Sequence, residues 1–150
     1  MRYQEEQYEE IVEDIQPLIK KHWKEIAIHQ DKIKLNPDYS KYETLSAMGM
    51  IRFFTVRDKE KLVGYFVVFV QPHIHYSEHV FAMNDIIYLD PDYRGGKTAF
   101  NLINFAESTL ANSGVSVLMI NMKVHAPFDK LLRGCGFENT EMLYSKYIGD

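Results

Sequence analysis

Apolar residues recur at three- and four-residue steps through the first third of the chain, a spacing that predicts helix. Pro17 falls inside this pattern, and because it has no N–H to donate, we expect it to begin a second helix or to kink the first. The turn signal Asn36-Pro37-Asp38 follows, and a short helix is expected over 42–48, before Gly49. The residues of the apolar pattern are Ile11, Ile15, Leu18, Ile19, Trp23 and Ile26.

β-Branched and aromatic residues dominate the chain after residue 50, which favours strands. The segments 51–56 and 62–70 are of this kind and are separated by the charged turn 57–61, so together they predict a β-hairpin. Strands and helices then alternate. This order of elements predicts one α/β domain over 1–150, a mixed sheet with helices on its faces. The remaining expected strands are 80–89, 115–121 and 142–148; the remaining helices are 128–132 and one with an apolar face of Ala99, Leu102, Ile103, Ala106 and Leu110.

Composition narrows the classes of protein that this domain could represent. The chain is 46% hydrophobic and carries a net charge of −4, which argues against a dedicated nucleic-acid binder. No apolar run approaches the roughly 20 residues that span a bilayer, and the glutamate-rich N-terminus is not a signal peptide. Cys135 is the only cysteine, so no intramolecular disulfide forms. We therefore expect a cytoplasmic protein that binds neither membrane nor nucleic acid.

The sequence Gly95-Gly96-Lys97-Thr98 raises the question of a nucleotide-hydrolase phosphate loop. That loop needs a further glycine five residues before its last one, and the chain has Pro91 there, which offers no N–H. The later strand that should end in a carboxylate ends in Asn121 instead. Both observations exclude the nucleotide-hydrolase interpretation.

A different phosphate-binding loop remains. Between the strand 80–89 and the following helix, Arg94 and Lys97 supply positive charge, and the two glycines let backbone amides approach an anion. The helix N-terminus adds its own amides and dipole, an arrangement suited to a pyrophosphate. An ordinary glycine turn before a helix is the alternative.

The segment "YLDPDYRGGKTAFNLINFAE" (88–107) closely resembles motif A of the GNAT superfamily of acyl-CoA N-acyltransferases. "FDKLLRGCGFENTEMLYSKYI" (128–148) resembles the C-terminal helix, Gly-Phe turn and final strand of the same family. The order of elements also matches, so the resemblance covers most of the chain and implies a mostly antiparallel, twisted sheet with helices on both faces. "HWKEIA" and "PHIHY" look most like acetyltransferase-like proteins of tailed bacteriophages, which would place the protein in the host cytoplasm.

The resemblance implies that acetyl-CoA is the co-substrate, with its pyrophosphate on the glycine loop and its pantetheine arm along the strand 86–89. One departure stands out: the family usually has glycine three residues after the arginine, where this chain has Lys97. The cofactor-binding residues that the resemblance implies are Ile87, Tyr88, Leu89, Arg94, Gly95, Gly96, Lys97, Thr98 and Ala99.

Acyl transfer to an amine needs a base for the ammonium proton and an acid for the leaving thiolate. Asp85 is the candidate base, since a carboxylate in an apolar stretch has a raised pKa; a bulge residue satisfied by the backbone is the alternative. Leu132 stands where the family often has the acidic tyrosine, so Tyr144 or Tyr147 is the substitute. His125 is a second candidate acid or thiol donor, with helix capping as the alternative.

Three histidines, His73, His75 and His79, follow the hairpin, but no carboxylate or cysteine is spaced to complete a metal site. We expect no metal, and assign the histidines and Tyr76 to the lining of an acceptor pocket. The acidic residues between Glu5 and Asp14 are expected to form a solvated face.

The sequence thus predicts an N-acetyltransferase that moves an acetyl group from acetyl-CoA to an unidentified amine, in a small molecule or a protein, by direct attack in a ternary complex. The alternative is a catalytically inactive GNAT-fold protein with a binding or structural role, for example in a virus. Lys97 and Leu132 keep this alternative open. A monomer and a homodimer are equally compatible with the sequence.

Overall fold

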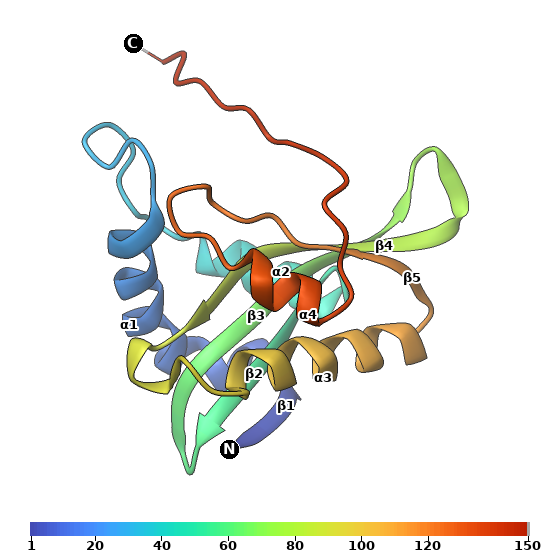
Figure 1. The fold of residues 1–150 in the computed structure, drawn as a ribbon, viewed down its shortest axis with the longest axis horizontal. Coiled ribbons are helices and arrows are strands. Elements are labelled where there is room, and N and C mark those ends of the chain that lie inside the picture. Colours follow the sequence, from blue (N-terminus) through green and yellow to red (C-terminus); the bar gives the residue numbers. More distant parts are fainter. Residues whose placement is uncertain (150) are drawn as a thin grey trace.

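Five strands form one sheet whose spatial order, β1-β2-β3-β4-β5, is also their order along the chain (Figure 1). The computed structural model describes residues 1–149. The first three strand pairs are antiparallel and β4–β5 is parallel, so the predicted mixed, mostly antiparallel sheet is confirmed. The strands are β1 (Arg2–Glu6), β2 (Ile51–Asp58), β3 (Lys61–His73), β4 (Tyr76–Leu89) and β5 (Val115–Met119).

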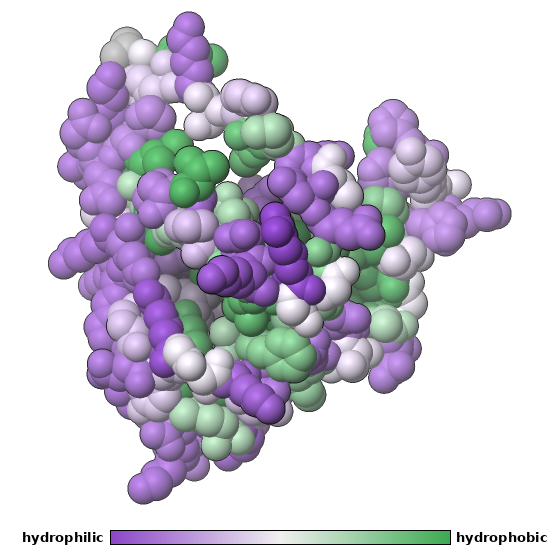
Figure 2. All heavy atoms as spheres, viewed as in Figure 1, coloured by the Kyte–Doolittle hydropathy of each residue, from purple (hydrophilic) through white to green (hydrophobic). Residues whose placement is uncertain are grey.

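Helices cover both faces of this sheet, as predicted (Figure 1). Alternate residues of the central strands point to opposite sides, so Phe53 and Val67 pack against α1 while Phe54 and Val68 pack against α3. The outer surface of α1 is hydrophilic along most of its length (Figure 2). The helices are α1 (Tyr8–Ile26), α2 (Tyr39–Ala47), the 3-10 turn η1 (Pro91–Tyr93), α3 (Thr98–Asn112) and α4 (Asp129–Gly134).

Helix α1 continues through Pro17 and neither ends nor restarts there. Pro17 is exposed, and so is Glu13, whose carbonyl loses its helical partner because proline has no N–H. That residue lies on the solvent side of the helix, while Ile15, Leu18 and Ile19 stay buried on the inner side. The expectation of a helix boundary at Pro17 was wrong because the proline faces solvent.

The strand β1 was not predicted from the sequence. Its charged residues read as a solvated face, yet Glu6 is buried and ion-pairs with Arg57, which is buried as well. Burial alone would raise the pKa of Glu6, but hydrogen bonds from Arg57 and Thr55 outweigh it and hold that pKa below its usual value. Arg57 also reaches Asp14 of α1 at 2.8 Å. The first strand is therefore secured by a partner 51 residues away.

The predicted last strand, 142–148, is absent from the described residues, and this expectation was wrong. The sheet ends at β5, and the C-terminal segment runs away from the body of the molecule (Figure 1). An apolar pattern makes a strand only where its backbone meets another strand's free edge. Here the side chains of Met142, Leu143, Tyr144 and Ile148 are exposed instead.

Gly64 of β3 lies opposite Leu89, where β4 ends and the glycine loop begins. A Cβ at position 64 would come within 2.8 Å of Leu89 Cδ1 and 2.9 Å of the Tyr88 carbonyl oxygen. We expect Gly64→Ala to lower the free energy of unfolding by about 1–3 kcal/mol through overpacking. Gly134→Ala is the matched control, since no atom lies within 4 Å of its added Cβ. Equal urea-denaturation midpoints for the two variants would contradict this expectation.

Candidate active site

The strands β4 and β5 separate at Asn84, whose side chain bonds to the backbone of Asn121; we call this pair of hydrogen bonds the asparagine clamp. Their parallel pairing covers only Val80–Met83 of β4, and Asn84 then bonds to the backbone of Asn121. Its Oδ1 accepts from the Asn121 N–H at 2.7 Å, and its Nδ2 donates to the Asn121 carbonyl at 3.3 Å. Beyond the clamp, β4 pairs with β3 alone. One edge of β4, from Asp85 to Leu89, is therefore open toward the side where β5 would continue.

A compact turn joins this open edge to α3. Asp90 caps η1 by accepting the Asp92 N–H, and Gly95 follows with a φ of +89°, a conformation that glycine adopts without strain. The first backbone bond of α3 runs from the Asn101 N–H to the Lys97 carbonyl. The N–H groups of residues 98–100 therefore have no acceptor within the helix, and no side chain caps them. This end of α3 is suited to an anion.

Lys97, the departure from the family motif, lies in backbone that does not require glycine. Its φ of −93° is negative and, with a ψ of 1°, corresponds to the bridge region that turn residues occupy, and its side chain is exposed. Gly95 is the loop residue whose backbone requires glycine. The loop therefore accommodates Lys97 without a positive φ at that position.

Arg94 ties the loop to α1. Its two terminal nitrogens bond both carboxylate oxygens of Glu25, at 2.7 and 2.8 Å, and its Nε donates to the Leu89 carbonyl at 2.7 Å. The guanidinium also lies over the Tyr88 ring. The hydrogen bonds to Glu25 raise the pKa of Arg94 still further, so it keeps its charge. The sequence predicted a cation for a phosphate, and the structure gives that cation a carboxylate partner.

Asp85 occupies a β-bulge just beyond the asparagine clamp. Val67 lies opposite Ile86 and Val68 lies opposite Asn84, which leaves Asp85 as the extra residue of β4. The side chain accepts a hydrogen bond from the Tyr42 hydroxyl of α2. Burial raises the pKa of Asp85, and the Tyr42 hydrogen bond lowers it in part. The bulge alternative was correct for the backbone, but a side chain rather than the backbone satisfies this carboxylate.

A buried histidine that the sequence analysis missed lies next to these residues. His22 bonds through Nδ1 to the Tyr65 hydroxyl at 2.9 Å and stacks on Tyr88 with ring centroids 5.0 Å apart. Burial lowers the pKa of His22 to about 4, so the imidazole is neutral. The signal was present in the sequence, because His22 continues the buried spacing of Ile15, Leu18 and Ile19 on α1.

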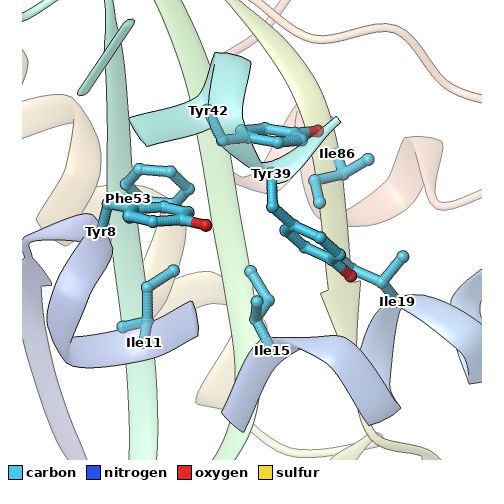
Figure 3. A pocket seen from close by; sticks show the side chains of 8 residues that line it. All are labelled: Tyr8, Ile11, Ile15, Ile19, Tyr39, Tyr42, Phe53 and Ile86. Atoms are coloured by element: carbon cyan, nitrogen blue, oxygen red, sulfur yellow. The ribbon is translucent and has the colours of Figure 1, made fainter. Parts of the chain in front are cut away.

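Tyr8, Tyr39 and Tyr42 join apolar side chains around a narrow hollow between α1, α2 and the sheet (Figure 3). Its volume of about 10 Å³ is close to the space of one water molecule. In this structure the hollow is thus the closely packed support beneath Tyr42 and holds no room for a substrate. Its other lining residues are Ile11, Ile15, Ile19, Phe53 and Ile86.

The three candidate acids lie away from Asp85. His125 is exposed, and its Nε2 donates at 2.9 Å to the carbonyl of Ile26, the last residue of α1, which matches the helix-capping alternative. Tyr144 is 84% exposed on the C-terminal segment. Tyr147, its alternative, meets His29 and Lys32 of the loop after α1. None of these contacts brings a proton donor to Asp85.

The hairpin histidines do not converge on a metal site. The rings of His73 and His75 contact each other, while His79 bonds through Nδ1 to Ser116 of β5. Within residues 1–149, no group of three histidine, cysteine, aspartate or glutamate side chains is arranged to hold a metal ion. In the same range, no helix has the length and apolar character needed to cross a membrane.

Several solved structures with the same architecture carry the name acetyltransferase. The ribosomal-protein-alanine N-acetyltransferase of Brucella melitensis biovar Abortus 2308 superimposes with a TM-score of 0.73 at 19% identity, over 99% of both chains. An aminoglycoside acetyltransferase from an uncultured soil metagenomic sample, in complex with sisomicin, gives 0.76 at 15% identity, over 99% of this chain and 95% of that one. A predicted acetyltransferase from Clostridium acetobutylicum with acetyl-CoA gives 0.73 at 10%, over 98% and 96%. At these identities the likeness establishes the fold.

Family membership rests on the sequence itself. No curated protein matches the chain in a sequence search. The sequence model of the acetyltransferase (GNAT) family, however, matches residues 12–137, which include the clamp, the bulge and the whole glycine loop. The chain belongs to the acetyltransferase (GNAT) family.

Proposed function

We propose that this protein transfers the acetyl group of acetyl-CoA to an amine by direct attack within a ternary complex. One observation carries the proposal: the open edge of β4 begins at a half-buried carboxylate and ends at the uncapped amides of α3. This succession of a base, a strand edge and an anion site suits acyl transfer from a long thioester that ends in a pyrophosphate.

The donor set of the chain fits acetyl-CoA along this path. The backbone of β4 from Ile86 to Leu89 offers the edge to which the amides of the pantetheine arm would bond, since β3 occupies only the other edge. The amides of Gly95, Gly96, Thr98 and Ala99 would bind the pyrophosphate at the uncapped start of α3, and Lys97 would add positive charge beside them. When bound, acetyl-CoA supplies an activated acetyl group as a thioester.

Asp85 is the proposed base. It lies where β4 leaves β5, at the start of the open edge, and an acceptor amine bound at that edge would lie next to it. Because burial raises the pKa of Asp85, the carboxylate holds an abstracted proton more firmly than an ordinary aspartate. An acidic partner is less important, because the CoA thiolate is a tolerable leaving group. His125 is occupied by Ile26, so we assign it to holding the end of α1.

The acceptor class stays broad within this proposal. One similar structure is named for the alanine of a ribosomal protein and another holds the aminoglycoside sisomicin. Both acceptors present an amine, and we propose an amine for this chain as well. The inactive alternative rests on Leu132, which lies in α4 where the family often has a tyrosine.

Cofactor binding is tested first at Gly96. No atom lies within 4 Å of a Cβ at this position, so Gly96→Val should fold as the wild type does while its branched side chain obstructs a phosphate. Ligand at one hundred times its Kd stabilises a protein by about 2.7 kcal/mol, and roughly tenfold weaker binding removes about half of that. We expect acetyl-CoA to raise the melting temperature of the wild type and of Gly134→Val, and to raise that of Gly96→Val much less. An unmoved wild-type curve at saturating acetyl-CoA would exclude the cofactor assignment.

Two variants of the ion pair between Arg94 and Glu25 distinguish the effect of the Arg94 charge on CoA binding from the effect of the link between the loop and α1. Both Arg94→Ala and Glu25→Gln break the pair, but only the first removes the cation at the loop. We expect CoA affinity, measured by calorimetric titration, to fall roughly tenfold in Arg94→Ala, the effect of losing one charge-assisted hydrogen bond. In Glu25→Gln it should be kept or increased. Equal losses in both variants would mean that the link to α1 matters and the charge does not.

The base is tested by Asp85→Asn. Release of CoA thiol across a panel of amines and peptides should fall roughly 10²–10⁴-fold while the melting shift with CoA is kept. The wild-type rate should rise with pH through the raised pKa of Asp85, and this rise should vanish in the variant. A wild type that binds CoA yet turns over no amine faster than Asp85→Asn would favour the inactive alternative.

Asp85→Asn should also change how the stability of the protein depends on pH. The unfolded chain ionises Asp85 at a lower pH than the folded protein does, because burial raises the folded-state pKa. The ionised carboxylate therefore lowers the stability of the wild type as pH rises, and asparagine removes this penalty. We expect the melting temperature of Asp85→Asn to gain on that of the wild type as the pH rises from about 4 through the raised pKa of Asp85. A difference that does not change with pH would show that Asp85 has no raised pKa.

A further inference from the structure

A tyrosine outside every family motif holds the candidate base. Tyr42 comes from α2, 43 residues before Asp85, and its hydroxyl donates a hydrogen bond to Asp85 Oδ2. The phenol is the donor, because an ionised carboxylate can only accept. Burial and the nearby Asp85 charge raise the pKa of Tyr42, so it keeps its proton wherever Asp85 is ionised.

The ring of Tyr42 is itself fixed by its neighbours. It packs against Tyr39 of α2 with centroids 6.4 Å apart, and against Phe53 of β2 with centroids 6.2 Å apart. Figure 3 shows Tyr42 lying across the hollow, with its hydroxyl pointing away from Tyr8 and Phe53. The hydroxyl therefore reaches the bulge from a rigid aromatic support.

Within residues 1–149, the Tyr42 hydroxyl is the hydrogen-bond partner that fixes the Asp85 side chain. As the extra residue of a bulge it has no residue opposite it on β3, and no salt bridge joins it to a cation within residues 1–149. The titratable groups that face it are Tyr42 from α2 and Tyr65 from β3, both of them protonated where a carboxylate titrates. His22 lies one step further, bonded to Tyr65.

We propose that Tyr42 is the positioning residue for Asp85: it occupies Oδ2 and so leaves Oδ1 directed to the acceptor amine. The inference rests on the proposed role of Asp85 as base. In the reaction the acceptor's proton passes to Oδ1, while the Tyr42 hydroxyl keeps its own proton and continues to donate to Oδ2. Helix α2 therefore determines the orientation of a residue that belongs to β4.

The first test requires no acceptor. In protein labelled with ¹³C at aspartate carboxyls, the Asp85 signal is assigned by its loss in Asp85→Asn and titrated in wild type, Tyr42→Phe and Tyr39→Phe. Losing a donor to the ionised form should move the Asp85 titration to higher pH in Tyr42→Phe. Tyr39→Phe is the matched control, from the same helix and hollow, and should titrate as the wild type does. An Asp85 titration unmoved by Tyr42→Phe overturns the proposal.

A second measurement leaves Tyr42 in place, should Tyr42→Phe fail to fold. The Tyr42 hydroxyl proton of the wild type should give a slowly exchanging, downfield NMR signal that shifts as Asp85 titrates and disappears in Asp85→Ala. A hydroxyl proton that exchanges rapidly and ignores the titration overturns the proposal.

Turnover supplies the third reading, with whichever amine of the panel the wild type acetylates. Tyr42→Phe should lower kcat roughly tenfold, leave the KM for acetyl-CoA unchanged and move the acid limb of the pH profile upward; Tyr39→Phe should do none of these. A tenfold loss with an unmoved pH limb would mean a merely structural role and overturn the proposal. If no amine is acetylated, the proposed function fails, and the two NMR measurements still decide whether Tyr42 holds Asp85.

Discussion

The bulge residue of β4, Asp85, determines which side chains of the second half of that strand face each side of the sheet. Strands alternate their side chains between two faces, so a single extra residue exchanges the faces of everything beyond it. Before the bulge, Ala82 faces α3; after it, Ile87 and Leu89 face α3, while Ile86 and Tyr88 face α1 and α2. Asp85 is the residue at which this exchange occurs. A carboxylate next to the sheet core is tolerated there because the bulge releases it from pairing and Tyr42 supplies a donor.

Helix α1 serves the glycine loop as well as the core. Its inner face buries Ile15, Leu18 and Ile19, but its polar residues reach the end of β4. The Lys21 Nζ lies 3.4 Å from Oδ2 of Asp90, the residue that caps the turn. Further along α1, Glu25 forms an ion pair with Arg94 of the loop. The loop is thus braced by ion pairs on one side and by the start of α3 on the other.

Patterns that are local in sequence predicted much of this architecture. The apolar spacing of α1, the hairpin of β2 and β3, and the turn into α3 each depend on residues close together in the chain, and the structure has all of them. Strand β1 could not be predicted from its own segment, because Glu6 is buried only through its ion pair with Arg57. The bulge could not be predicted either, because it depends on the register of β4 against β3. The same holds for the bonds from Tyr42 to Asp85 and from Tyr65 to His22. The segment 142–148 shows the converse, since its pattern favours a strand but its backbone meets no edge.

The loop at the start of α3 presents mainly backbone amides, and its arginine is already matched by a carboxylate. Amides carry fixed partial charges that neither gain nor lose protons, and Glu25 keeps Arg94 charged throughout. In the proposed function, phosphate binding by this loop would therefore be insensitive to pH over the range in which Asp85 changes its protonation. Binding of the acyl donor and activation of the acceptor would then be separate steps, and a change of pH would act on the second alone.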